Sequence, residues 1–418
     1  MTTKEKIETM KAQTRDVLTT NILPFWMNRM VDEEHGGFYG RIDGAGNVHK
    51  DAEKGAILNA RILWSFSAAY RIIGDPEYLT MARRALHYIL DHFVDKEYGG
   101  VYWSVDAYGN AKDSKKQTYA IGFAIYGMSE FLRATKGRCA SEEAKKEYEE
   151  TADQVIALYR SIEEHAYDSV NNGYVEALSR DWQPIADMRL SDKDENGSRT
   201  MNTHLHILEP YTNLLRALPE RMDAGRVRNF IDIFMEKFMN PDGHLDLFFN
   251  DQWQGKRDMQ SYGHDIEASW LMHEALLVWL KGNACPACCQ GYKARVEDAV
   301  KKIARASEKG VRADGAMEYE TNYVSGYKDS SIQWWVQCEN IIGHANLFQY
   351  FGDEEALDVA WRCWEYTRKN LVDNEGGEWY WSINADGTTN RKDDKAGFWK
   401  CPYHNSRLCL EIIERELI

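Results

Sequence analysis

The chain lacks long apolar runs, and its basic residues are in the minority. None of its 418 residues falls in an apolar segment that approaches the roughly 18 to 20 residues of a membrane span. The polar start, residues 1–16, lacks the apolar region of a signal peptide. Its 66 acidic against 51 basic residues give a formal charge of −15, which repels phosphate backbones and anionic lipids. We therefore expect a cytoplasmic protein that binds neither membranes nor nucleic acid.

Proline and paired cysteine motifs are also scarce. The eight prolines agree with a helix-rich chain, because proline interrupts helices. Cys285, Cys288 and Cys289 are closely spaced, but no second paired motif completes the four ligands of a structural zinc site. We interpret this segment as a connector with free thiols. No glycine-rich phosphate loop is seen either, so we predict no metal and no cofactor.

A glycine-containing hairpin signature recurs six times along the chain. Each copy has one or two glycines within a short turn, followed by apolar or aromatic residues, and several continue through an alternating stretch to a second turn. The copies begin at His35, Tyr98, Asn172, Asp242, Asp314 and Glu375. They lie roughly 60 to 75 residues apart, which leaves room for two helices in each interval. The chain is therefore predicted to consist of six similar units.

Each interval divides into two helices of different character. Residues 55–73 are apolar nearly all round, as in a buried helix, whereas 76–94 carry a single apolar stripe. The alternation repeats at 117–135 and 147–165 and at 262–280 and 293–309, with 4–19 as the first outer helix and 402–417 as the sixth inner helix. Twelve such helices predict an all-α fold, an (α/α)6 barrel with hairpins at one end. No linker rich in Pro, Gly or Ser divides it, so we expect residues 1–418 to form one domain.

Polar and aromatic residues recur in the early part of the predicted inner helices. Because these parts follow the hairpins, they are expected to meet at one mouth of the barrel. The candidates are Arg61, Tyr119, Asn202, His206, His264, Glu267, Trp270, Trp334, Trp335, Glu339, Trp399 and His404. Each alone has a structural interpretation, as a core ion-pair partner, a capped histidine or a core tryptophan. Their shared position in the repeat favours a common site, and the 14 Trp and 23 Tyr suit the faces of sugar rings.

The segment Ser261–Trp270 carries the most acid/base chemistry of the set. On a helix, His264 and Glu267 are three residues apart and share a face. We expect this carboxylate to orient the imidazole and keep it basic, which would make His264 a general base. Trp270 would lie one turn further on and help to wall the pocket.

Five motifs resemble those of the cellobiose 2-epimerases, which belong to the N-acylglucosamine 2-epimerase superfamily. They are Asn59–Trp64, Thr200–His206, Ser261–Trp270, Trp334–Glu339 and Trp399–Asn405. The resemblance covers nearly the whole chain and implies an (α/α)6 barrel. It further implies that His264 and His404 are the acid/base pair and that Arg61, Asn202 and His206 hold substrate oxygens. By the same resemblance Trp335 and Trp399 stack on sugar rings, and Tyr119, Glu267 and Glu339 complete the site.

This resemblance predicts inversion of C2 in the reducing-end sugar of β-1,4-linked disaccharides such as cellobiose, mannobiose and lactose. The reaction needs ring opening, removal of the C2 proton and stabilisation of an enediolate. Which histidine removes the proton is open. Alternatives are an aldose-ketose isomerase or an N-acylglucosamine 2-epimerase of the same superfamily, an inverting glycoside hydrolase using Glu267 and Glu339, and a non-catalytic sugar-binding barrel. We expect a disaccharide as the partner molecule and a monomer, with a homodimer as the alternative.

Overall fold

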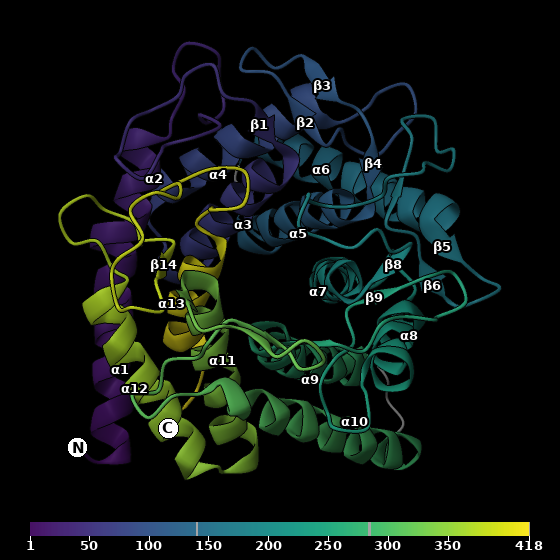
Figure 1. Cartoon of the computed structure of the whole chain (residues 1–418). Helices are drawn as coiled ribbons and strands as arrows, with labels where there is room; N and C mark the ends of the chain where they lie inside the picture. The colour runs from purple at the N-terminus through teal and green to yellow at the C-terminus, as the bar shows by residue number, and fades with distance from the viewer. Residues whose placement is uncertain (139–140, 283–285, 418) are drawn as a thin grey trace.

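Six inner helices form a closed ring in the computed structural model, which describes residues 1–138, 141–282 and 286–417 (Figure 1). They are α3 (Ala56–Ile73), α5 (Thr118–Thr135), α7 (Met201–Ala217), α9 (Tyr262–Gly282), α11 (Trp334–Phe351) and α13 (Tyr403–Glu414). Each packs against the next in this order, and α13 packs against α3. The predicted (α/α)6 barrel is confirmed.

An outer layer of helices surrounds this ring. It comprises α1 (Thr3–Val17), α4 (Pro76–Tyr88), α6 (Glu142–Ser161), α8 (Ala224–Ile233), α10 (Pro286–Ser307) and α12 (Glu354–Asn370). Four of them end in a π-helical turn, at η1 (Leu18–Ile22), η2 (Ile89–Phe93), η3 (Ile162–Ala166) and η4 (Phe234–Phe238), and α10 ends in the 3-10 turn η5 (Glu308–Gly310). After η1 the chain continues into α2 (Leu23–Arg29). The outer helix predicted at 293–309 begins earlier, because its buried stripe of Val296, Val300 and Ile303 sets the phase of a helix but not its first residue.

Short strands tie the six units together at the mouth. The strand before an inner helix pairs with the hairpin of the following unit: β1 (Lys54–Gly55) with β2 (Ser104–Val105), β4 (Lys116–Gln117) with β7 (Ala177–Leu178), β8 (Arg199–Thr200) with β9 (Phe248–Phe249), β10 (Met259–Ser261) with β11 (Glu320–Asn322), and β13 (Ile332–Gln333) with β14 (Ser382–Ile383). A bridge between Ala396 and Ile42 supplies the sixth pair and closes the circle. This circle holds the first turns of the inner helices at one end of the barrel.

The six predicted glycine hairpins are present. Five close through a single bridge, such as Val31 with Phe38, and the third closes through β5 (Tyr167–Asp168) with β6 (Gly173–Tyr174). The hairpins of β2 and β11 continue into β3 (Ala111–Asp113) and β12 (Tyr327–Asp329). Five of the six glycine hairpins place glycine where φ is positive, as at Gly37 with φ +61°, and the third places Asn172 there with φ +55°.

Buried ion pairs fasten three of these hairpins to the strands that precede inner helices. The Nζ of Lys54 lies 2.7 Å from Asp32, that of Lys116 lies 2.8 Å from Asp95, and that of Lys395 lies 2.8 Å from Asp373. Each aspartate also accepts backbone N–H groups of its own turn, as Asp32 does from Glu34 and His35. The carboxylate thus fixes both the turn and the neighbouring strand.

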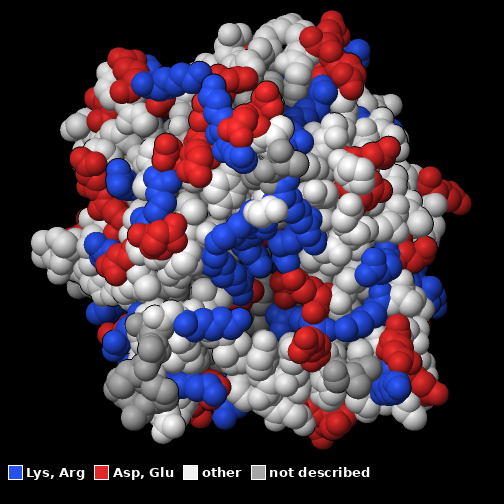
Figure 2. Space-filling view, turned by 180° about the vertical axis from the view of Figure 1, so that it is seen from behind, with Lys and Arg blue, Asp and Glu red and all other residues white. Residues whose placement is uncertain are grey.

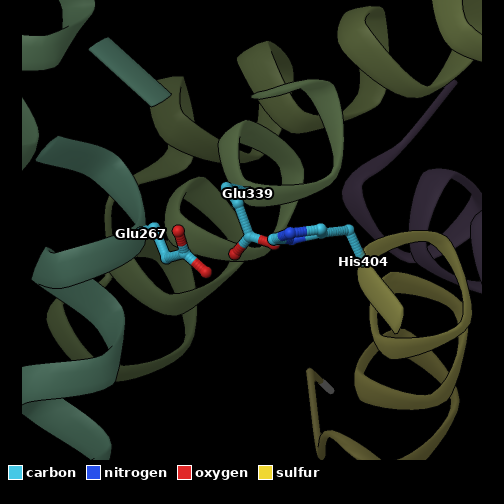
Figure 3. Close-up of side chains that lie close together, drawn as sticks. All are labelled: Glu267, Glu339 and His404. Atoms are coloured by element: carbon cyan, nitrogen blue, oxygen red, sulfur yellow. The ribbon is translucent and has the colours of Figure 1, made fainter. Parts of the chain in front are cut away.

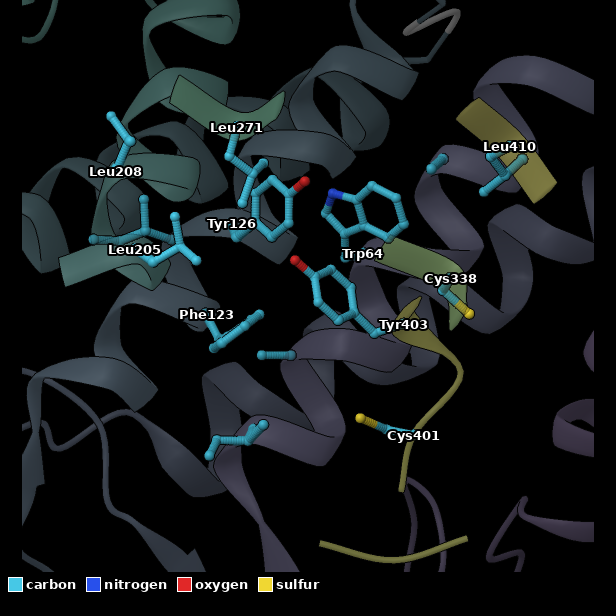
Figure 4. Close-up of a cluster of buried hydrophobic side chains, with 14 of the residues drawn as sticks. Trp64, Phe123, Tyr126, Leu205, Leu208, Leu271, Cys338, Cys401, Tyr403 and Leu410 are labelled. Atoms are coloured by element: carbon cyan, nitrogen blue, oxygen red, sulfur yellow. The ribbon is translucent and has the colours of Figure 1, made fainter. Parts of the chain in front are cut away.

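Large aromatic and apolar side chains fill the space between the inner helices (Figure 4). Trp64 of α3 stacks on Tyr126 of α5 with ring centroids 5.3 Å apart, and meets the edge of Tyr403 of α13 at 5.5 Å.

No helix in the described part of the chain is long and apolar enough to cross a membrane. Cys139 and Cys285 lie outside the described residues, as does the Cys288 side chain, whereas Cys289, Cys338, Cys363, Cys401 and Cys409 are free thiols.

The inner helices all point their N-termini toward the mouth and their C-termini toward the opposite end. Four of them carry a cation in the last turn, at Arg71, Arg133, Arg216 and Lys281, where the helix dipole favours positive charge. Figure 2 shows Lys and Arg gathered around the centre of the face opposite to that in Figure 1. Because the inner helices begin at the mouth, their N-termini bring partial positive charge to it, which favours anions there.

Candidate active site

A cavity of about 480 Å³ opens at the mouth of the barrel. Ten of the twelve candidate residues line it, namely Arg61, Tyr119, Asn202, His206, His264, Glu267, Trp334, Trp335, Trp399 and His404. The other two, Trp270 and Glu339, are buried beneath it. Trp270 donates its Nε1–H to Glu339 over 3.0 Å, so it supports the floor of the pocket and does not form its wall.

His404, at the start of α13, is held by a carboxylate. Its Nδ1 lies 2.7 Å from Oε1 of Glu339 (Figure 3). Burial, together with the nearby Arg61 and Arg407, keeps the pKa of His404 well below its ordinary value. The imidazole is therefore neutral, and its Nδ1–H donates to Glu339. Nε2, which has no hydrogen-bond partner among the described residues, keeps its lone pair for a ligand proton.

His264 is oriented by a hydroxyl group and not by Glu267. Its Nδ1 lies 2.7 Å from Oγ of Ser261, the last residue of β10. Glu267 instead accepts a hydrogen bond from Arg407 over 2.6 Å. The prediction that Glu267 orients His264 is wrong, because a buried guanidinium competes for that carboxylate. Burial, with a smaller contribution from His206, lowers the pKa of His264 to about 3.

Trp335 contacts both imidazoles. Its ring centroid lies 4.8 Å from that of His264 and 5.7 Å from that of His404. The two histidines come from α9 and α13, which do not follow one another in the chain, yet they border one cavity. Both imidazoles can therefore reach a ligand bound in this cavity.

Arg407 is the centre of a buried network that sequence reasoning missed. Its guanidinium donates to Glu267 over 2.6 Å and to Glu339 over 2.7 Å, and also contacts Glu209 and Tyr403. Four inner helices therefore meet at one side chain. The available signal was a charged residue within a helix predicted to be buried, since arginine is rarely buried without partners.

His206 lies at a kink in α7. Its backbone has φ −88° and ψ 17°, four residues before Pro210, which has no N–H to give to the His206 carbonyl. The His206 carbonyl packs against Gly122 of α5, where an added Cβ would lie only 2.5 Å from the carbonyl oxygen. The kinked backbone places the imidazole in the cavity, and its Nδ1 lies 3.1 Å from Glu209.

Gly122→Ala is expected to displace His206 and lower activity. The added methyl cannot fit against the backbone oxygen of a packed inner helix, so both the free energy of unfolding and kcat/KM should fall. The free-energy loss expected for overpacking is about 1 to 3 kcal/mol. Gly291→Ala on α10 is the matched control, because its Cβ would have open space. Equal unfolding midpoints for these two variants in denaturant would contradict this account of the kink.

Arg61 of α3 brings positive charge to the cavity. It donates to the hydroxyl of Tyr119 over 2.9 Å and to Sγ of Cys401 over 3.4 Å. Four buried polar atoms of cavity residues have no partner in the described structure: Nε of Arg61, Oδ1 of Asn202, Oε2 of Glu267 and Nε1 of Trp334. Buried polar groups are normally hydrogen-bonded, so these atoms indicate a polar ligand.

Two loops that sequence reasoning did not assign cover the mouth. Residues 190–194 line the cavity, as do Tyr319 and Asp329 of the β11–β12 arm and Trp381. A second cavity of about 480 Å³ adjoins the first and shares Asn202, His264, Lys193, Asp194 and Tyr319 with it. The candidate site thus continues into a second space, whose lining adds the carboxylates of Glu176, Asp258 and Glu320.

Glu267, Glu339 and His404 are also close enough to be considered as metal ligands, with their ligand atoms within 4.8 Å of one another. Arg407 donates to both of these carboxylates. The positive charge that a metal ion would bring is already supplied by this guanidinium, so the three residues do not fit a metal site.

The low pKa of His264 predicts that its imidazole remains neutral well below pH 6.5. His87 is a control, since the hydrogen bond that its Nε2–H donates to Glu147 raises its pKa. Histidine side-chain NMR at pH 6 should show His87 protonated and His264 neutral. Because only the unfolded chain takes up this proton below the ordinary value of 6.5, the contribution of His264 to the free energy of unfolding falls as pH is lowered toward 3. If His264 and His87 both became protonated near pH 6.5, the prediction that His264 stays neutral at pH 6 would be wrong.

The barrel and the set of imidazoles, carboxylates and indoles at its mouth define a carbohydrate-active enzyme. The chain belongs to the N-acylglucosamine 2-epimerase family, whose model matches residues 37–407. It is 53% identical to a cellobiose 2-epimerase of Bacteroides fragilis over 97% of this chain and 99% of that one. A Ruminococcus albus cellobiose 2-epimerase is 36% identical over 97% and 99%. The solved cellobiose 2-epimerase of Bacillus thermoamylovorans superimposes with a TM-score of 0.88 at 40% identity, covering 98% of this chain and 100% of that one.

Proposed function

We propose that this enzyme inverts C2 of the reducing-end sugar of β-1,4-linked disaccharides, with cellobiose as the first substrate and mannobiose and lactose as others. Full-length similarity to cellobiose 2-epimerases supports the activity. The observation that carries the proposal is the pair of neutral imidazoles, His264 and His404, that border one cavity and contact the same indole. An epimerase needs acid/base groups on both sides of one carbon, and two imidazoles at one cavity support assigning them this role.

The proposed reaction begins with opening of the sugar ring to the C1 aldehyde. The C2 proton is then acidic enough for an imidazole to remove, provided that the enediolate oxygens are stabilised. Arg61, Asn202 and His206 supply charge and donors, and the N-termini of the inner helices add favourable potential. Burial lowers the pKa values of His264 and His404. The negative charge that develops on the enediolate raises the pKa of a neighbouring imidazole and so favours its protonation.

His404 and His264 are proposed to act on opposite faces of C2. His404 is suited to removing the proton, because Glu339 bonded to its Nδ1–H stabilises the imidazolium that results. His264, once it has taken up a proton from solvent, returns that proton to the other face of C2, and His404 releases the proton it removed to solvent. Since the reaction is reversible, the two histidines exchange these roles when the opposite epimer is the substrate.

The aromatic residues of the cavity are proposed to hold the two sugar rings. Trp335 at the start of α11 and Trp399 just before α13 both line the cavity. Trp334 lines the same space with an Nε1–H that has no partner among the described residues. Sugar C–H groups can stack on the indole faces, while this N–H can donate to a hydroxyl.

Product analysis tests the activity. Cellobiose, mannobiose and lactose are each incubated with the enzyme, and the products are identified by NMR. We expect each glucose-headed sugar to yield the mannose-headed epimer and the reverse. Ketose products would instead support an aldose-ketose isomerase, which returns the proton to C1, and release of monosaccharides would support a hydrolase.

The inverting hydrolase alternative is not favoured by the geometry. Such enzymes need carboxyl groups about 6.5 to 9.5 Å apart, with room for a water molecule. Glu267 and Glu339 have oxygens within 4.8 Å of each other, and Arg407 bridges them. A substrate bond cannot be placed between these two side chains.

A further inference from the structure

One oxygen of Glu267 is buried at the cavity without a partner. The side chain is 1% exposed and lines the cavity. Its Oε1 accepts from Arg407, whereas Oε2 makes no hydrogen bond in the described structure. An ionised carboxylate at this depth is expected to gather donors around both oxygens. The lack of a donor to Oε2 of Glu267 therefore needs an explanation other than ionisation.

The neighbouring carboxylates are fully supplied with donors. Glu339 accepts from Arg407, from Nε1 of Trp270 and from Nδ1 of His404. Glu209 contacts Arg407, Tyr403 and His206. Each of these two carboxylates therefore has donors on both oxygens, and Glu267 has a single donor.

The charges around the cavity floor point the same way. One cation, Arg407, bonds to three carboxylates, those of Glu209, Glu267 and Glu339, whereas Arg61 bonds to Tyr119 and Cys401. Burial would raise the pKa of Glu209, but Arg407 and His206 lower it to about 2, so it is ionised. Three ionised carboxylates around one guanidinium would leave uncompensated buried negative charge, which is costly. Burial raises the pKa of Glu339 as well, but its three donors favour its ionised form. Burial and repulsion from Glu339 hold the pKa of Glu267 well above its ordinary value.

We propose that Glu267 is kept as a neutral carboxylic acid whose Oε2–H donates a hydrogen bond to an oxygen of the bound sugar. The proposal rests on the proposed function, since the oxygen that gains most from this donor is one of the two enediolate oxygens. A neutral carboxyl group in a low-dielectric site is a strong donor to a developing oxyanion, and it adds no charge to the site. Glu267 thus joins Arg61 and Asn202 as a group that stabilises the intermediate, and the base role stays with the histidines.

Infrared spectroscopy of the whole protein at pH 7 tests the protonation state without any substrate. The wild-type minus Glu267→Gln difference spectrum should contain the carbonyl stretch of a protonated carboxyl group. Glu130→Gln is the control, because Arg133 and Arg71 outweigh burial and lower the pKa of Glu130 to about 2, so its difference spectrum should show only loss of an ionised carboxylate. A carboxylate band in place of the carbonyl band for Glu267 would overturn the proposal.

Activity tests the donor role. Glu267→Gln retains a donor of the same shape and should lose less than about tenfold in kcat for C2 exchange. Glu267→Leu has no donor and should lose about 10²- to 10³-fold, the usual cost of an oxyanion donor. A loss in Glu267→Gln as large as in Glu267→Leu, with both variants folded by circular dichroism, would overturn the donor role. If the wild type exchanges no sugar, the proposed function fails, while the infrared band still decides whether Glu267 is neutral.

Discussion

His404→Ala is expected to lower the rate of C2 proton exchange by about 10²- to 10⁴-fold, the usual contribution of a general acid or base. The loss should appear in kcat, because the imidazole acts on the proton in the transition state. The fold should remain, since Nε2 of His404 bonds to no described group and only the bond to Glu339 is removed. Exchange is measured by NMR with cellobiose.

His344→Gln is the matched control for this variant. His344 is also buried on an inner helix, where its Nδ1 bonds to the carbonyl of Asn340, but it does not line the cavity. Its substitution should leave exchange within about twofold. An equally small effect of His404→Ala would remove His404 from the acid/base pair.

Arg407→Met is expected to lower the free energy of unfolding by about 3 to 5 kcal/mol, the usual cost of removing one partner from a buried ion pair. The substitution leaves Glu209, Glu267 and Glu339 buried without their shared cation. Loss of activity should accompany it, because Glu339 then no longer holds His404 in place. Denaturant unfolding measures the free energy, with the slope checked for two-state behaviour.

An exposed ion pair provides the contrast for Arg407. Lys145 and Glu142 on α6 lie 2.6 Å apart, with side chains 57% and 85% exposed. Lys145→Ala should not shift the unfolding midpoint measurably, because exposed pairs contribute little. A midpoint for Arg407→Met that matches the one for Lys145→Ala would show that the buried network is not important for stability.

The barrel could be predicted because its evidence is local in sequence. Each hairpin needs glycine in its turn, and each inner helix needs apolar residues on all sides, so six repeats of both patterns define the architecture. The same repeat indicated where the site lies, since Asn202, His264 and His404 are in the first turn of their inner helices and Arg61 and His206 follow one turn later. The circle of strands at the mouth was not predicted, because two-residue strands leave no period in the sequence.

The partners of the site residues could not be predicted. The i, i+3 spacing of His264 and Glu267 indicates a shared helix face, but the choice of partner depends on groups from other helices. Arg407 is such a group for Glu267, whereas Ser261, three residues before His264, is a local competitor for the imidazole. The actual histidine–carboxylate pair joins His404 to Glu339 across 65 positions. Pairings between distant helices require the three-dimensional arrangement.

Deuterium incorporation tests the central claim most directly. The enzyme is incubated with cellobiose in D2O, and the C2 position of both epimers is followed by NMR. Proton removal by imidazoles predicts deuterium at C2 together with a change from glucose to mannose configuration. A changed configuration with the original hydrogen kept at C2 would contradict an enediolate in exchange with these histidines, and no change at all would contradict epimerisation itself.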